Sequence, residues 1–106
     1  KGTKLIMNFI DQDILESKMN SEIFKINESC YVKNIDDSNY NHDLNQKWVK
    51  IYFDWVHQNP IIEPIVNSKF YIESWNSNGW KVVNNITYED QNDLTSIYRW
   101  LIFEKS

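Results

Sequence analysis

Asp54 and His57 are the side chains in this sequence best suited to transferring a proton. Three positions apart on a helix, a carboxylate and an imidazole share one face and can form a pair. Such a pair could supply the general acid and base of a small hydrolase or ribonuclease. The sequence has no glycine-rich phosphate loop and no nucleophile elbow, and Arg99 is its only arginine. Catalysis by Asp54 and His57 is therefore an alternative and not the leading hypothesis.

Metal coordination has less support than catalysis. His42 and His57 lie far apart in the sequence, and Cys30 is the only cysteine, so neither a CxxC pair nor an HExxH motif is present. A single cysteine also excludes an internal disulfide, and we expect Cys30 to be a small buried hydrophobic residue. We therefore expect no metal and no organic cofactor.

Acidic side chains gather in two polar stretches of the chain. Asp36 and Asp37 form one cluster, and Glu89 and Asp90 with Asp93 form the other. The chain carries 15 acidic and 11 basic residues, which gives a net charge of −4. Because nucleic-acid binding needs a basic surface, this balance disfavours a nucleic-acid partner. The clusters are either solvated loop charge or contacts for a basic protein partner, such as a toxin or an enzyme, whose association they would accelerate.

Aromatic residues make up 15% of the chain, and many lie in the segment Lys69–Tyr88. Two aromatic and β-branched runs flank Asn76-Ser77-Asn78-Gly79, where Asn and Gly tolerate the positive φ of a tight turn. The pattern predicts an antiparallel hairpin over residues 69–88. Trp75 and Trp80 would then flank the turn, either as core residues or as partly exposed anchors for a partner. The predicted face of the hairpin carries Tyr71, Trp75, Trp80, Val82, Ile86 and Tyr88.

The first half of the chain predicts a helix, a hairpin and a loop. Asn8–Met19 has a capping residue and an apolar stripe, which are typical of a short helix. Glu22–Ile35 contains two β-like runs around Asn27-Glu28-Ser29 and predicts a hairpin. Asp36–His42 is a polar loop rich in turn-forming residues.

The second half contains two ambiguous segments. Asp43–Asn59 fits a helix by its capping pair and apolar spacing and a strand by its alternation, and its length favours the helix. Pro60–Ser68 contains two prolines and predicts an extended crossover. Leu94–Glu104 fits a strand or a helix, and its β-branched and aromatic content favours the strand.

Together these elements predict an α+β fold. We expect an antiparallel sheet of about four to five strands, with the hairpin 69–88 at its centre and one or two helices packed on it. A chain of 106 residues suits a single globular domain over residues 1–106, with Met7 a candidate native start and residues 1–6 a candidate vector remnant. No apolar run reaches about 18 residues and no signal peptide is recognisable, so we expect a cytoplasmic protein without a membrane span.

The leading functional hypothesis is a small non-catalytic protein-binding protein that acts as a stoichiometric inhibitor. A bacterial immunity protein, which neutralises a toxin, and a phage-type inhibitor are its concrete forms. Its candidate binding residues are Trp75, Trp80, Asp36, Asp37, Glu89, Asp90 and Asp93. The alternatives are a ligand-binding module with an aromatic pocket between helix and sheet, and the Asp54–His57 enzyme.

Overall fold

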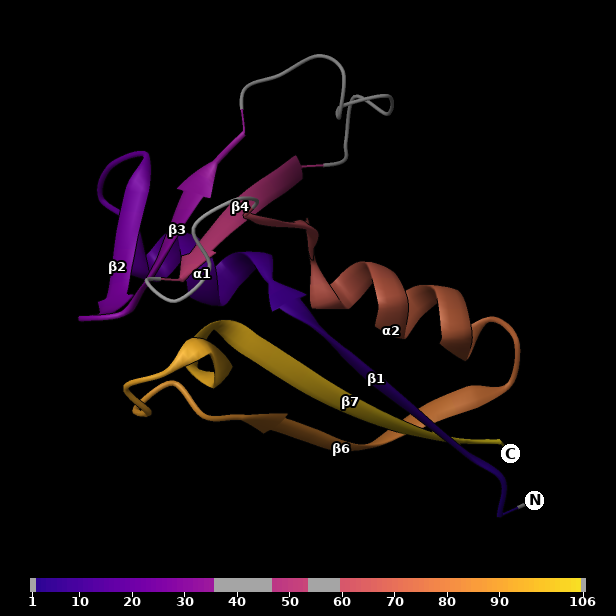
Figure 1. Cartoon of the computed structure of the whole chain (residues 1–106). Coiled ribbons are helices and arrows are strands. Elements are labelled where there is room, and N and C mark those ends of the chain that lie inside the picture. The colour runs from indigo at the N-terminus through magenta and orange to yellow at the C-terminus, as the bar shows by residue number, and fades with distance from the viewer. Residues whose placement is uncertain (1, 36–46, 54–59, 106) are drawn as a thin grey trace.

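One mixed β-sheet organises the part of the chain that the structure describes (Figure 1). The computed structural model describes residues 2–35, 47–53 and 60–105. Within these residues the sheet has seven strands in the order β2-β3-β4-β5-β1-β7-β6, with β1 parallel to β5 and the other neighbours antiparallel. The elements in chain order are β1 (Lys4–Asp11), α1 (Gln12–Lys18), β2 (Ile23–Asn27), β3 (Cys30–Asn34), β4 (Lys47–Phe53), β5 (Ile61–Val66), α2 (Ser68–Asn76), β6 (Trp80–Thr87), the 3-10 helix η1 (Leu94–Ile97) and β7 (Tyr98–Lys105).

The predicted antiparallel sheet of four to five strands is wrong, because the structure has a seven-stranded mixed sheet. One cause is the helix predicted over Asp43–Asn59, whose residues 47–53 form β4 instead. β4 pairs with β3 on one side and with β5 on the other. Hydrogen bonds from two neighbouring strands therefore outweigh the helical spacing of this segment. Residues 36–46 and 54–59, which include the predicted loop Asp36–His42, lie outside the described residues.

The predicted hairpin over 69–88 is also wrong. Ser68–Asn76 is the helix α2, capped by the side chain of Asn67, and only Trp80–Thr87 is a strand. The conformational part of the prediction is confirmed, since Gly79 has a φ of 85°. This left-handed residue lies where α2 ends and β6 begins, a position that favours glycine. The turn therefore joins a helix to a strand.

The helix predicted over Asn8–Met19 starts later than expected. The chain remains extended through Asp11, whose carboxylate caps α1 by accepting from the Ile14 backbone N–H at 2.9 Å. The predicted hairpin within Glu22–Ile35 is confirmed as β2 and β3, and the extended crossover is confirmed as β5. The final predicted strand is confirmed as β7, which follows η1.

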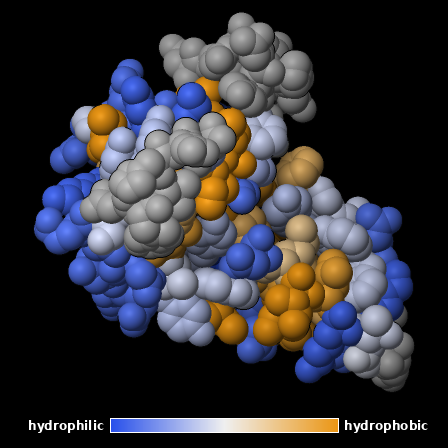
Figure 2. Space-filling view, in the orientation of Figure 1, coloured by the Kyte–Doolittle hydropathy of each residue, from blue (hydrophilic) through white to orange (hydrophobic). Residues whose placement is uncertain are grey.

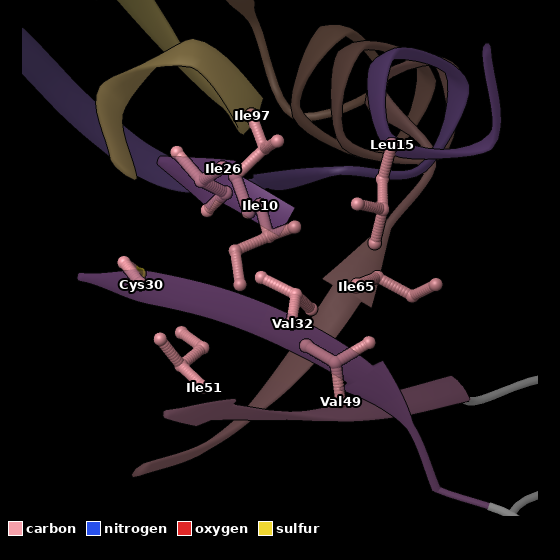
Figure 3. Packing of buried hydrophobic residues seen from close by; sticks show 9 residues of the cluster. All are labelled: Ile10, Leu15, Ile26, Cys30, Val32, Val49, Ile51, Ile65 and Ile97. Carbon is pink, nitrogen blue, oxygen red and sulfur yellow. The ribbon is translucent and has the colours of Figure 1, made fainter. Parts of the chain in front are cut away.

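The first hydrophobic cluster lies between α1 and the half of the sheet formed by β2 to β5. Figure 3 shows Leu15 of α1 on one side of this cluster and Val49 and Val32 of the sheet on the other. Ile10 of β1 and Ile97 of η1 complete its centre, and both are almost fully buried. These contacts place α1 and η1 on one face of the sheet, which we call face A.

The second hydrophobic cluster lies on the opposite face, which we call face B. Phe9, the neighbour of Ile10 in β1, points to this side because successive strand residues alternate. It packs edge-on against Tyr71 of α2, with ring centroids 5.1 Å apart. Leu101 and Phe103 of β7 are fully buried in the same cluster. Helix α2 therefore covers face B of β1, β7 and β6, whereas α1 and η1 on face A lie at the Ile10 end of β1 (Figure 1).

A buried ion pair fixes the end of β1. Arg99 of β7 donates through Nε to Oδ1 of Asp11 at 3.0 Å and through a terminal nitrogen to Asn85 of β6 at 2.6 Å. The side chain of Asp11 is 0% exposed and that of Arg99 is 18% exposed. The second carboxylate oxygen of Asp11 caps α1. One carboxylate therefore links α1, β1 and β7, and through Arg99 also β6.

Candidate functional site

An apolar strip runs across face A of β1, β7 and β6. The pairing places Ile6 beside Ile102, and Ile86 beside Trp100. Because Ile10 and Tyr98 form another pair on this face, the alternation along each strand puts these residues on the same side. The strip consists of Ile6, Ile86, Tyr88, Trp100 and Ile102.

The strip exposes large apolar side chains and is held by aromatic contacts. Ile6 is 67% exposed and Tyr88 is 47% exposed, while Trp100 is partly buried. The Tyr88 and Trp100 rings meet edge to face with centroids 5.3 Å apart, and the Tyr98 ring lies 6.3 Å from Trp100. Figure 2 shows hydrophobic residues at the visible surface in the half of the molecule that holds α2 and the terminal ends of β1 and β7. Large exposed apolar side chains grouped on one face are typical of an interaction surface.

The second acidic cluster of the sequence borders this strip. Glu89 and Asp90 follow Tyr88 directly and Asp93 lies three residues further on, and all three are exposed. Lys18 of α1 holds the segment by donating to the Glu89 carbonyl oxygen at 2.9 Å. Asp93 accepts from the Thr95 backbone N–H at 3.0 Å and so caps η1. The acidic residues are therefore kept next to an aromatic centre, the arrangement of a polar rim around an apolar interface.

Tyr98 links the strip to the first hydrophobic cluster. Burial raises the pKa of Tyr98 from its ordinary value of 10.0 to about 12, with smaller contributions from the charges of Glu63 and Cys30. Between these values the unfolded chain loses the phenol proton while the folded protein keeps it. We therefore expect the free energy of unfolding to fall as the pH rises through 10 to 12.

The variant Tyr98→Phe tests this expectation, since it keeps the ring and removes the titrating group. Denaturant unfolding at a series of pH values above 9 should show a shallower alkaline loss of stability in Tyr98→Phe than in the native protein. Tyr88→Phe is the matched control, because its ring is exposed at the edge of the strip. Identical alkaline profiles for the native protein and Tyr98→Phe would contradict the assignment.

The structure places Trp75 of α2 against Trp80 of β6. Their rings meet edge to face with centroids 5.9 Å apart, and Trp75 lies 6.2 Å from the buried ring of Phe103. Lys105 of β7 lies over the Trp80 ring at 5.4 Å. Both tryptophans are partly buried, so each retains some exposed surface. The rings of Tyr71 and Trp75 of α2 pack onto the buried aromatic residues of the sheet.

The predicted hairpin face is divided between the two faces of the sheet. Trp80 and Val82 pack with α2 on face B, whereas Ile86 pairs with Trp100 on face A. A β-bulge between Val82 and Asn84 causes the change, because one extra residue reverses the alternation. The prediction that Tyr88 and Trp80 share a face is therefore wrong.

Several predicted residues lie outside the described part of the chain. These are Asp36, Asp37, His42, Asp54 and His57. Cys30 is buried in the first hydrophobic cluster, which confirms the role expected for it. Within residues 2–35, 47–53 and 60–105, no three His, Cys, Asp or Glu side chains form a group that could hold a metal ion.

Sequence reasoning missed Trp100 and Ile6 as surface residues. The signal for Trp100 was the alternation of Trp100 and Ile102 with Leu101 and Phe103 in a segment already predicted as a strand. Ile6 carries no such signal, because it lies among residues 1–6, the candidate vector remnant. The structure brings both together by pairing the two ends of the chain.

Within the described residues, no helix is long and apolar enough to cross a membrane. Comparison of the chain with known protein families finds no matching family model, and comparison with curated proteins finds no matching sequence.

Proposed function

We propose that the protein is a small non-catalytic binding protein that blocks a basic protein partner through the apolar strip. The observation that carries the proposal is the surface formed by the exposed Ile6 and Tyr88 and the partly buried Trp100, with the acidic rim beside it. Tryptophan and tyrosine are favoured interface anchors, because they bury a large area for few rotatable bonds. We assign the anchor role to Trp100, since Trp75 and Trp80 contribute to the packing between α2 and the sheet.

The acidic rim supports a basic partner and a mechanism of stoichiometric inhibition. Carboxylates at the edge of an interface steer an oppositely charged partner and raise its association rate. A toxin or enzyme with a basic active site would therefore be captured quickly and held by the apolar centre. This is the mode of action expected of an immunity protein or a phage-type inhibitor, which form the proposed class.

Substitution of Ile6 with lysine tests the strip with little risk to folding, because the side chain is exposed. The partner retained from a lysate of the source cells should be basic, and Ile6→Lys should weaken its binding by at least about tenfold. Phe70→Lys is a matched control, since Phe70 is 65% exposed and lies on α2. Equal binding by the native protein, Ile6→Lys and Phe70→Lys would exclude the strip as the interface.

The rim is tested separately by association kinetics. Neutralising Glu89, Asp90 and Asp93 should lower the association rate more than it raises the dissociation rate, and salt should slow association of the native protein. An association rate that does not depend on salt would contradict the steering role.

A further inference from the structure

A second surface, with no helix over it among the described residues, lies on face B of β3 and β4, away from the apolar strip. Along β4, Trp48, Lys50 and Tyr52 alternate with the buried Val49 and Ile51. Along β3, Tyr31 and Lys33 flank the fully buried Val32 in the same way. Because the buried partners face α1, the alternation places the others on the opposite side. We call this surface the lysine–aromatic face, and it consists of Tyr31, Lys33, Trp48, Lys50 and Tyr52.

The strand register arranges these side chains in rows. Tyr31 pairs with Tyr52, and their rings stack with centroids 4.6 Å apart and planes within 10° of parallel. In the next row Lys33 pairs with Lys50. Trp48 lies two residues before Lys50 on the same strand. The lysine row therefore lies between the stacked pair Tyr31–Tyr52 and Trp48.

Lys33 and Lys50 are like charges placed directly opposite each other, an arrangement that destabilises a sheet. Neither has an ion-pair partner among the described residues. Lys25 of β2 pairs with Tyr31 and adds a third ammonium group, whose contact with Glu28 is solvent-exposed and weak. An anion bound over this row would relieve the repulsion.

We propose that the lysine–aromatic face binds single-stranded nucleic acid. Phosphates would contact Lys33 and Lys50, and bases would stack on the outer face of Tyr31, which is 36% exposed. Open sheets with aromatic and basic side chains bind single strands in this way. An acidic polypeptide would use the lysines but would gain little from the flat rings. Of the 15 acidic residues, Glu89, Asp90 and Asp93 border the apolar strip and not this face.

A fluorescently labelled oligothymidylate is the probe for this face. For single strands, the slope of log K against log salt is about −0.7 per neutralised phosphate, so three lysines predict a slope of roughly −2. Lys33→Gln with Lys50→Gln should reduce the magnitude of the slope by about 1.4. Tyr31→Leu should weaken binding at least about fivefold, the low end of the contribution of one stacked base.

Matched controls separate this face from the rest of the surface. Lys81→Gln removes the same charge from the exposed part of β6, and Tyr88→Leu removes an exposed tyrosine ring from the apolar strip. Both should bind oligothymidylate like the native protein, as should Ile6→Lys, which makes the result independent of the proposed inhibitor function. Thermal melting of each variant establishes that it is folded.

Three outcomes would overturn the proposal. The first is that the native protein does not bind oligothymidylate. The second is that the folded variants of Lys33, Lys50 and Tyr31 bind it as tightly as the native protein does. The third is binding of polyglutamate that requires Lys33 and Lys50 but is unaffected by Tyr31→Leu, with no preference for oligothymidylate. That third result would assign the face to an acidic polypeptide.

Discussion

Replacing Asp11 with asparagine is expected to lower the free energy of unfolding by about 3–5 kcal/mol. The substitution leaves Arg99, which is 18% exposed, with its guanidinium partly buried and without its carboxylate. Removing one member of a buried ion pair is costly because the remaining charge stays desolvated. Asparagine can still cap α1, so the loss reports the ion pair rather than the helix cap. Denaturant unfolding measures the change.

A double-mutant cycle isolates the pair. Arg99→Met should also be strongly destabilising, because it leaves the buried carboxylate of Asp11 without its cation. The double variant Asp11→Asn with Arg99→Met should be considerably more stable than the sum of the two losses predicts. Asp11→Ala should cost about 1 kcal/mol more than Asp11→Asn, because it removes the cap to Ile14 as well.

Additive losses in this cycle would contradict the coupling between Asp11 and Arg99. A small loss in Asp11→Asn alone would show that the guanidinium finds water or another acceptor after the substitution. Asn85 already accepts a hydrogen bond from the Arg99 guanidinium. The double-mutant cycle should therefore also be measured in an Asn85→Ala background.

The local signals in the sequence predicted the elements that depend on local chemistry. Cys30–Asn34 and Ile23–Asn27 form the expected hairpin, because the turn residues between them select it. Gly79 has the positive φ that its type suggested. The two prolines kept Ile61–Val66 out of a helix. In each of these cases the determining residues lie within a few positions of one another.

The wrong secondary-structure predictions concern segments whose conformation depends on pairing or packing with strands that are distant in sequence. Lys47–Phe53 carried both a helical and an alternating pattern, and its pairing with β3 and β5 selected the strand. Ser68–Asn76 carried aromatic residues typical of strands, yet Tyr71, Ile72 and Trp75 also fall on one side of a helix. Packing of that side onto β1 and β7 outweighed the strand propensity. Neither partner strand could be identified from the segment alone.

Only part of the candidate site could be predicted, again because some of its features depend on distant contacts. The acidic character of Glu89, Asp90 and Asp93 is visible in the sequence, but the apolar strip that they border is not. The strip requires pairing of β1 with β7, which joins the two ends of the chain, and a bulge that turns Ile86 to face A. Both features depend on contacts far apart in sequence.

Truncation of Phe103 to alanine is expected to cost about 3–5 kcal/mol of stability. The ring is 0% exposed and lies under Trp75 of α2, between Leu5 of β1 and Val82 of β6 in the register. Helix α2 has nine residues, too few for a helix to be stable without tertiary packing. The cavity should therefore also loosen α2, and amide hydrogen exchange in residues 71–76 should accelerate.

Ile102→Ala is the matched control for Phe103→Ala, because Ile102 is the preceding residue of β7 and points to the open face A. Its side chain is only partly buried, so its truncation should cost about 1 kcal/mol and leave hydrogen exchange in α2 unchanged. Equal losses for the two variants would show that both faces of β7 are covered to the same extent. That result would contradict the assignment of α2 to face B and remove the apolar strip as an exposed surface. A large loss of stability in Phe103→Ala alone, together with faster hydrogen exchange in α2, would support the position of α2 on face B and the exposure of the apolar strip.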